Sequence, residues 1–117
     1  MSDNFNKHRK ITITIGVGQT KNGGKLTDEQ LANAMVSTGT LVVEAGYEGY
    51  QLHSHAGGWV VGKETIVENC VSVVIITDQL DIGCTRARLV TLAGQLRDMF
   101  EQTCVAVSIE ELQFALV

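Results

Sequence analysis

The chain has 117 residues, of which 44% are hydrophobic and 19% are charged, and its formal net charge is −4. This composition excludes an intrinsically disordered chain, and the net negative charge excludes a general basic surface for nucleic acid. No apolar run approaches the roughly 18–20 residues of a membrane span. The length fits one domain with one core, so we expect residues 1–117 to form a single domain.

The first element is preceded by a basic cluster, residues 7–10, which we interpret as a solvated approach to a strand. Ile11, Ile13 and Ile15 then alternate with threonines. This period of two predicts a strand over residues 10–17. A polar, glycine-rich loop follows over residues 18–25.

A helix is predicted to begin after Thr27. Thr27 and Gln30 have the spacing of a capping box, and Asp28 and Glu29 suit the positive end of a helix dipole. Gly46 is a plausible stop signal. The positions that share one predicted buried face are Leu31, Ala34, Met35, Thr38, Leu41, Val42 and Ala45.

Two strands are predicted next, over residues 47–56 and 66–77. The glycine pair at 57–58 is expected to end the first of them, and residues 59–64 are expected to form a hairpin connection. The second strand contains the most apolar run of the chain, residues 71–76, which is typical of a central strand buried on both faces.

The last third is predicted to hold a helix over about residues 85–102 and a short strand over residues 104–107. Ser108 and Glu111 have capping-box spacing, so we expect a short C-terminal helix over residues 109–116.

The predicted order β-α-β-β-α-β is that of an α+β, ferredoxin-like sandwich, with two helices on one face of an antiparallel sheet. Several strands carry apolar residues on both faces. We therefore expect another subunit to cover the other sheet face, and we predict a homo-oligomer. Threefold assembly is common for such sheets, and the number of subunits stays open at this point.

The three cysteines, Cys70, Cys84 and Cys104, have no metal-binding spacing. An odd number without such spacing in a cytoplasmic chain favours reduced thiols. The polar residues 1–6 lack the apolar stretch of a signal peptide, so we expect a cytoplasmic protein. We predict no metal site, no cofactor, and neither nucleic acid nor membrane as a partner.

The loop after the first strand is the first candidate binding element. Gly18, Gln19 and Thr20 lie between a strand and a helix, where backbone N–H groups can hold a ligand. The segment matches neither a P-loop nor a dinucleotide fingerprint. An ordinary mobile loop and a ligand-closing loop both stay open.

Glu68 is the strongest single candidate. It comes just before the most apolar strand, where partial burial would raise a carboxyl pKa and a cationic ligand would offset that effect. A solvated strand-end carboxylate is the alternative.

His53 and His55 are two apart on one strand and therefore share a face. They could contact a ligand or lie at a surface or interface, and a zinc ion would need a third ligand, for which Cys70, Glu64 and Glu68 are the candidates.

Trp59, beside two glycines, could stack on a ring or a cation, or anchor the hairpin. Arg86 and Arg88 open the second helix and could hold carboxylates, a ligand anion or a neighbouring subunit.

Two segments resemble the small S-adenosylmethionine lyases of bacteriophages, also called S-adenosylmethionine hydrolases. One is Glu68-Asn69-Cys70-Val71-Ser72-Val73, and the other is Phe100-Glu101-Gln102-Thr103-Cys104-Val105. The similarity spans residues 11–108, and a glycine-rich hairpin lies between the two segments. The chain is also similar to uncharacterised small bacterial ferredoxin-like domains.

The lyase resemblance implies a trimer with the site between subunits, a catalytic carboxylate at Glu68, and action in the host cytoplasm if a phage encodes the chain. Where the family has a tyrosine in the hairpin, this sequence has Trp59. The implied reaction is attack of the substrate's own carboxylate on its γ-carbon, which releases methylthioadenosine and leaves homoserine lactone. Gly18, Gln19, Thr20, Trp59, His53 and His55 are then the expected substrate-binding residues.

Two classes of function follow from the sequence. The first is this lyase. The second is a non-enzymatic module that binds or sequesters a nucleotide-like ligand at a subunit interface.

Overall fold

The computed structural model describes residues 5–78 and 82–117, without the side chains of residues 59, 61 and 82–85. These residues form four strands and two helices in the predicted order. They are β1 (Asn6–Gly16), α1 (Asp28–Glu44), β2 (Gln51–Val61), β3 (Glu64–Thr77), α2 (Ile82–Met99) and β4 (Ala106–Phe114).

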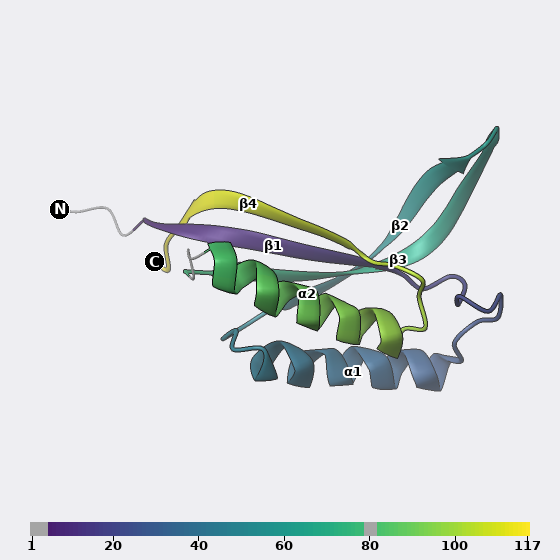
Figure 1. Ribbon diagram of the computed structural model, residues 1–117, viewed down its shortest axis with the longest axis horizontal. Coiled ribbons are helices and arrows are strands. Elements are labelled where there is room, and N and C mark those ends of the chain that lie inside the picture. Colours follow the sequence, from purple (N-terminus) through teal and green to yellow (C-terminus); the bar gives the residue numbers. More distant parts are fainter. Residues whose placement is uncertain (1–4, 79–81) are drawn as a thin grey trace.

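The four strands form one antiparallel sheet in the order β2-β3-β1-β4. Both helices lie on one face of this sheet, and the β2–β3 hairpin curves away from the rest of the molecule (Figure 1). This arrangement confirms the predicted α+β, ferredoxin-like fold.

The core lies between the sheet and the two helices. Ile11, Ile13 and Ile15 of β1 are fully buried there, which confirms the face that their alternation predicted. The predicted face of α1 and the apolar stripe of α2 pack against them. Their buried apolar side chains include Ala34, Val42, Leu89, Leu92 and Leu96, and Phe100 joins them just after α2.

The ends of α1 follow the local sequence signals. Thr27 accepts a hydrogen bond from the Gln30 backbone N–H at 3.1 Å, and the Gln30 side chain accepts one from the Thr27 N–H at 2.9 Å. The predicted capping box is therefore confirmed. Gly46 has φ 95°, so the chain turns away just after the helix in a conformation that suits glycine.

The boundary predicted at the glycine pair is wrong. β2 begins at Gln51 and continues through Gly57 and Gly58 to Val61, and the tight turn falls at Gly62, which has φ 63°. Gly57 pairs with Glu68 in the ladder, and a Cβ on it would lie 2.9 Å from the sulfur of Cys70. Gly57 therefore leaves space for the Cys70 side chain of the neighbouring strand, and β2 continues past it.

The predicted C-terminal helix is also wrong, because β4 continues to Phe114. Each residue from Ala106 to Phe114 is paired with one of β1, from Thr14 back to Asn6. The ring of Phe114 lies 5.1 Å from that of His8. The capping-box pattern at Ser108 is a local preference, and pairing with a strand a hundred residues away overrides it.

The sheet face opposite the helices carries Thr12, Thr14, Ser72 and Val74, alternating with the core residues of the same strands. Within residues 5–78 and 82–117, no helix covers this face (Figure 1). The oligomer expected to cover it stays a prediction. Among the same residues, no helix has both the length and the apolar character needed to cross a membrane.

Candidate functional site

Glu68 is half-buried on β3, where the hairpin leaves the body of the sheet. Its side chain lies against the backbone at the end of β1. A Cβ at Gly16 would overlap the Glu68 carboxylate, and a Cβ at Gly18 would lie 2.8 Å from both Cβ and Oε2 of Glu68. The two glycines therefore allow the acid to approach the main chain closely.

A cavity of about 600 Å³ opens beside this carboxylate, and we call it the Glu68 cavity. Elements far apart in the sequence form it: the end of β1, the loop after it, β3, and the segment between α2 and β4. Its lining includes Gly16, Gln19, Thr20, Glu68, Cys70 and Gln102. Two of the predicted loop residues, Gln19 and Thr20, thus share one cavity with the predicted carboxylate.

Gly18 lies in a smaller hollow of about 420 Å³, which Glu68 and Gln19 also line. Lys25 lines this hollow, whereas Lys21 lines the Glu68 cavity. Glu68 therefore faces two adjoining spaces, each with one lysine. Carboxylate and ammonium groups around one space suit a ligand that carries both charges.

The thiol of Cys70 forms an uncharged part of the cavity wall. Cys70 is only 3% exposed, and its sulfur lies 3.8 Å from the backbone oxygen of Glu68. Burial raises the pKa of the Cys70 thiol, the Glu68 charge raises it further, and a backbone hydrogen bond from Gly57 partly lowers it. A thiol in this state is a poor nucleophile at neutral pH.

The two histidines of β2 lie outside the linings of both hollows, within the part of the chain that the structure describes. His53 Nε2 lies 3.1 Å from Oε1 of Gln51. His55 Nε2 lies 2.7 Å from the hydroxyl of Ser72, which in turn lies 3.2 Å from that of Thr14. Their assignment to substrate binding stays a prediction.

The hairpin residue predicted to face a ligand is only partly described. Trp59 pairs with Ile66 in the β2–β3 ladder, and its side chain lies outside the described part of the chain. Ile66 lines both hollows beside Glu68. The ladder therefore brings the backbone of Trp59 close to this site.

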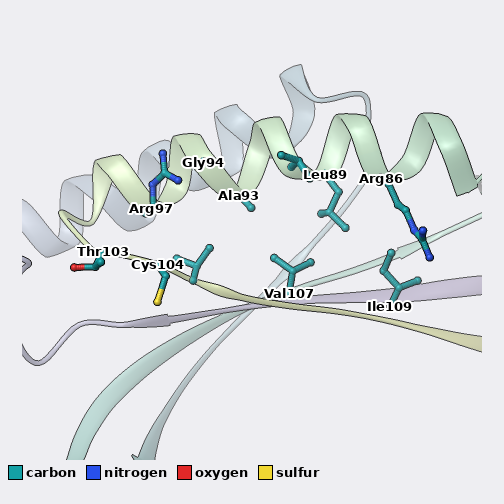
Figure 2. A pocket seen from close by; sticks show the side chains of 11 residues that line it. Arg86, Leu89, Ala93, Gly94, Arg97, Thr103, Cys104, Val107 and Ile109 are labelled. Atoms are coloured by element: carbon teal, nitrogen blue, oxygen red, sulfur yellow. The ribbon is translucent and has the colours of Figure 1, made fainter.

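A third hollow, of about 580 Å³, separates α2 from the edge strand β4. Figure 2 shows Leu89 and Ala93 of α2 facing Val107 and Ile109 of β4 across it, whereas Cys104 points to the other side of the strand. Among the described residues, its lining is mainly apolar and contains no carboxylate, so it has fewer groups that could bind a charged ligand than the Glu68 cavity.

The two arginines near the start of α2 have separate surroundings. Arg86 lies at one end of the third hollow and extends toward β4 (Figure 2). Arg88 lies beside Gly46, 3.1 Å from where a Cβ would be, and its charge partly lowers the pKa of Tyr47, which burial raises. In the described chain, neither arginine lines the Glu68 cavity.

Sequence reasoning missed the residues between α2 and β4. Gln102, Thr103 and Cys104 line the Glu68 cavity, and the Gln102 amide donates a hydrogen bond to the backbone oxygen of Gln19 at 2.9 Å. Eighty-three positions separate these two glutamines, so no local spacing could reveal the contact. The only signal was the segment 100–105 in the family resemblance.

Among the residues that the structure describes, no group of three or more His, Cys, Asp or Glu side chains is arranged to hold a metal ion.

No family model matches the sequence, and no curated protein matches it. Solved structures do. A phage SAM lyase in complex with S-methyl-5′-thioadenosine superposes with a TM-score of 0.64 at 16% identity, covering 99% of this chain and 93% of that one.

Two other similar structures come from a PII-like protein and a CutA protein. CPII, a nitrogen regulatory PII-like protein from Thiomonas intermedia K12 bound to ADP, AMP and bicarbonate, has a TM-score of 0.52 at 13% identity, covering 97% of this chain and 98% of that one. CutA, the periplasmic divalent cation tolerance protein from Archaeoglobus fulgidus, has a TM-score of 0.57 at 9% identity, covering 93% and 87%.

At these identities the likeness establishes the fold. The resemblance drawn from the sequence is confirmed at that level: this chain has the ferredoxin-like architecture shared by phage SAM lyase, PII-like and CutA proteins.

Proposed function

We propose that this protein is a lyase that converts S-adenosylmethionine to methylthioadenosine and homoserine lactone, with the Glu68 cavity as part of its substrate site. One observation carries the proposal. A half-buried carboxylate, fitted against two glycines, lines a cavity of about 600 Å³ in a chain that covers nearly all of a phage SAM lyase.

The reaction is an intramolecular displacement that needs no protein nucleophile. The substrate's carboxylate oxygen forms a bond to its γ-carbon while the bond from that carbon to sulfur breaks. The bonding electron pair goes to the sulfonium, which leaves as neutral methylthioadenosine. The protein's main tasks are to fold the substrate into a reactive geometry and to exclude water.

Each lining group has a task in this scheme. The Glu68 carboxylate orients the ammonium group or the ribose hydroxyls of the substrate. Main-chain groups at Gly18, Gln19 and Thr20 hold the methionine or adenosine part. The Cys70 thiol stays uncharged, so it does not compete with the substrate's own carboxylate.

We further propose that a neighbouring copy completes the site, and that Trp59, His53 and His55 contact substrate there. The uncovered sheet face and the projecting hairpin support a homo-oligomer, for which a trimer is the favoured number. The proposed place of action is the cytoplasm, which is the host's if a phage encodes the chain. Sedimentation at micromolar concentration should give a stable oligomer, and a clean monomer would rule out a shared site.

The decisive experiment incubates purified protein with S-adenosylmethionine and follows the products by mass spectrometry against a control without protein. Glu68→Gln should lower turnover at least about tenfold while the oligomer stays intact. Glu64→Gln, an exposed glutamate at the start of the same strand, is the matched control and should keep wild-type turnover. Equal turnover in both variants would remove Glu68 from the mechanism.

The second candidate is a module that binds a nucleotide-like ligand without turning it over. The PII-like structure bound to ADP and AMP favours it, because that chain has a similar fold. Intact S-adenosylmethionine together with thermal stabilisation by a nucleotide would support this function. A ligand present at a hundred times its Kd stabilises by about 2.7 kcal/mol, which a thermal shift detects easily.

A further inference from the structure

The end of α2 forms a turn that is unusual for its residue type. The backbone N–H of Glu101 donates to the oxygen of Asp98 at 3.1 Å, and that of Gln102 donates to the oxygen of Arg97 at 2.9 Å. This pattern places Glu101 at the left-handed position that glycine usually occupies in helices that end this way. Glu101 has φ 54°, the only positive φ among the non-glycine residues described.

The turn directs two hydrogen-bonding groups at the loop after β1. The backbone oxygen of Glu101 accepts a hydrogen bond from the Lys21 N–H at 2.7 Å. The Gln102 side-chain amide donates to the oxygen of Gln19 at 2.9 Å and to that of Phe100 at 3.1 Å. One amide group therefore joins the end of the helix to the loop.

The loop itself is held mainly by its own bonds. The Thr20 N–H donates to the Gly24 oxygen at 2.8 Å, the Gly23 N–H donates to the Thr20 oxygen at 3.0 Å, and the Gln19 side chain donates to the Gly23 oxygen at 3.1 Å. Among the described residues, the hydrogen bonds that join the middle of the loop to the rest of the protein are made with Glu101 and Gln102, just after α2.

We propose that Gln102 is a positioning residue, which holds the loop of residues 17–25 in place beside Glu68. Gln19 and Thr20 line the cavity with Glu68, and Gly18 lies against the Glu68 side chain. Release of the loop therefore changes the shape of the space on two sides of the carboxylate. The effect on the loop is independent of the proposed lyase function, whereas the kinetic effect rests on that function.

The effect on KM follows from the fraction of molecules in which the loop is in place. If substrate binds only when the loop is in place, the apparent affinity falls in proportion to the fraction of molecules in that state. Loss of the Gln102 contact should raise KM at least about fivefold and leave kcat within about twofold. A residue that acted only on overall stability would not produce this separation.

The test uses variants that keep the shape of Gln102 and remove its donor. Gln102→Glu is isosteric but presents a carboxylate to two backbone oxygens, and Gln102→Met keeps the length without a charge. Gln95→Glu makes the same chemical change at an exposed site on α2, away from the Glu68 cavity, and is the control. The direct readout is hydrogen exchange in residues 18–25, where the Lys21 N–H, bonded to the Glu101 oxygen, reports whether the loop stays against the end of α2.

We expect exchange in residues 18–25 to accelerate at least about tenfold in Gln102→Glu and Gln102→Met, with no change in Gln95→Glu. Should Gln102→Glu fail to fold, Gln102→Met carries the same test. Unchanged loop exchange in the folded variants overturns the proposal, whatever the activity. Faster exchange in a protein that does not turn over S-adenosylmethionine supports the role of Gln102 and refutes the lyase instead.

Discussion

The carboxylate of Glu68 occupies the space that a side chain at Gly16 would fill. The displaced group is the far end of a flexible side chain, so Gly16→Ala should move the carboxylate and leave the fold intact. We expect turnover of S-adenosylmethionine to fall at least about tenfold, as in Glu68→Gln, with stability within about 1 kcal/mol of wild type. Product assays and urea denaturation measure the two quantities.

Gly49→Ala is the matched control for that change. No atom lies within 4 Å of a Cβ built at Gly49. It should therefore keep both the wild-type turnover and the wild-type stability. If Gly16→Ala were as active as Gly49→Ala, the fit between glycine and carboxylate would have no part in catalysis.

The left-handed residue at the end of α2 predicts a stabilising substitution. Glu101 has φ 54°, and a residue with a Cβ is disfavoured there by roughly 1–2 kcal/mol. Glu101→Gly should raise stability by about 1 kcal/mol, or the melting temperature by about 4 °C. Glu101→Ala also removes the carboxylate but keeps the Cβ, so it should give no gain. Equal melting temperatures for the two variants would show that φ strain is unimportant at this turn.

Tyr47 gives a prediction about pH. Its ring is 2% exposed, and its hydroxyl has no hydrogen-bond partner among the described residues. Burial raises the pKa of Tyr47 above the ordinary value of 10.0, and Arg88 partly opposes this. The folded state therefore holds the proton more tightly, and this contribution to stability is lost as the pH rises above about 10.

Tyr47→Phe should consequently leave stability at pH 7 unchanged or raise it by up to about 1 kcal/mol, because a buried hydroxyl without a partner is removed. Its stability should also fall less steeply than that of wild type above pH 10. Urea denaturation at pH 7 and pH 10.5 tests both points. A loss of more than about 1 kcal/mol at pH 7 would reveal that the hydroxyl has a stabilising contact.

The cysteines of the cavity differ in exposure, which predicts different reactivity. Cys104 is exposed, whereas Cys70 is buried and its thiol pKa is raised by burial and then by Glu68. In a Cys84→Ser background at pH 8, a thiol reagent should modify Cys104 at least about tenfold faster than Cys70. Modification of Cys104 should also slow turnover, because this residue lines the Glu68 cavity.

Peptide mapping by mass spectrometry locates the modified thiol. Cys104→Ser should abolish the fast reaction and leave the slow one. Equal rates at the two positions would contradict the burial of Cys70.

The elements that could be predicted are those with signals inside a few residues. The alternation of Ile11, Ile13 and Ile15 identified the buried face of β1, and the Thr27 capping box identified the start of α1. The prediction that the glycine pair at 57–58 ends the strand was wrong, because glycine also occurs where two segments of one chain approach closely. A single sequence does not separate these two uses.

The candidate site was predictable only in part for the same reason. Glu68 stood out because an acid precedes an apolar strand, and the loop at Gln19 stood out because of its glycines. That the two line one cavity follows from the β1–β3 pairing, in which Gly16 lies opposite Cys70. Gln102 joins them through contacts between distant segments, which spacing does not encode.

The C-terminal segment offers the sharpest contrast between local and distant signals. A terminal helix over residues 109–116 would be dispensable, whereas residues 109–114 pair with residues 6–11 of β1. Ile109 packs against the core, and Glu111 lies 4.0 Å from the buried guanidinium of Arg9. Deleting residues 109–117 should therefore lower the free energy of unfolding by at least about 3 kcal/mol, through lost ladder hydrogen bonds and lost burial.

Deleting only residues 115–117 is the control, since they follow the last paired position, Phe114. That shorter deletion should change stability by no more than about 0.5 kcal/mol. Urea denaturation of both truncated proteins separates the two cases. Equal midpoints for the long and the short deletion would mean that residues 109–114 of β4 contribute nothing to stability, and that a local helix preference suffices to describe the end of the chain.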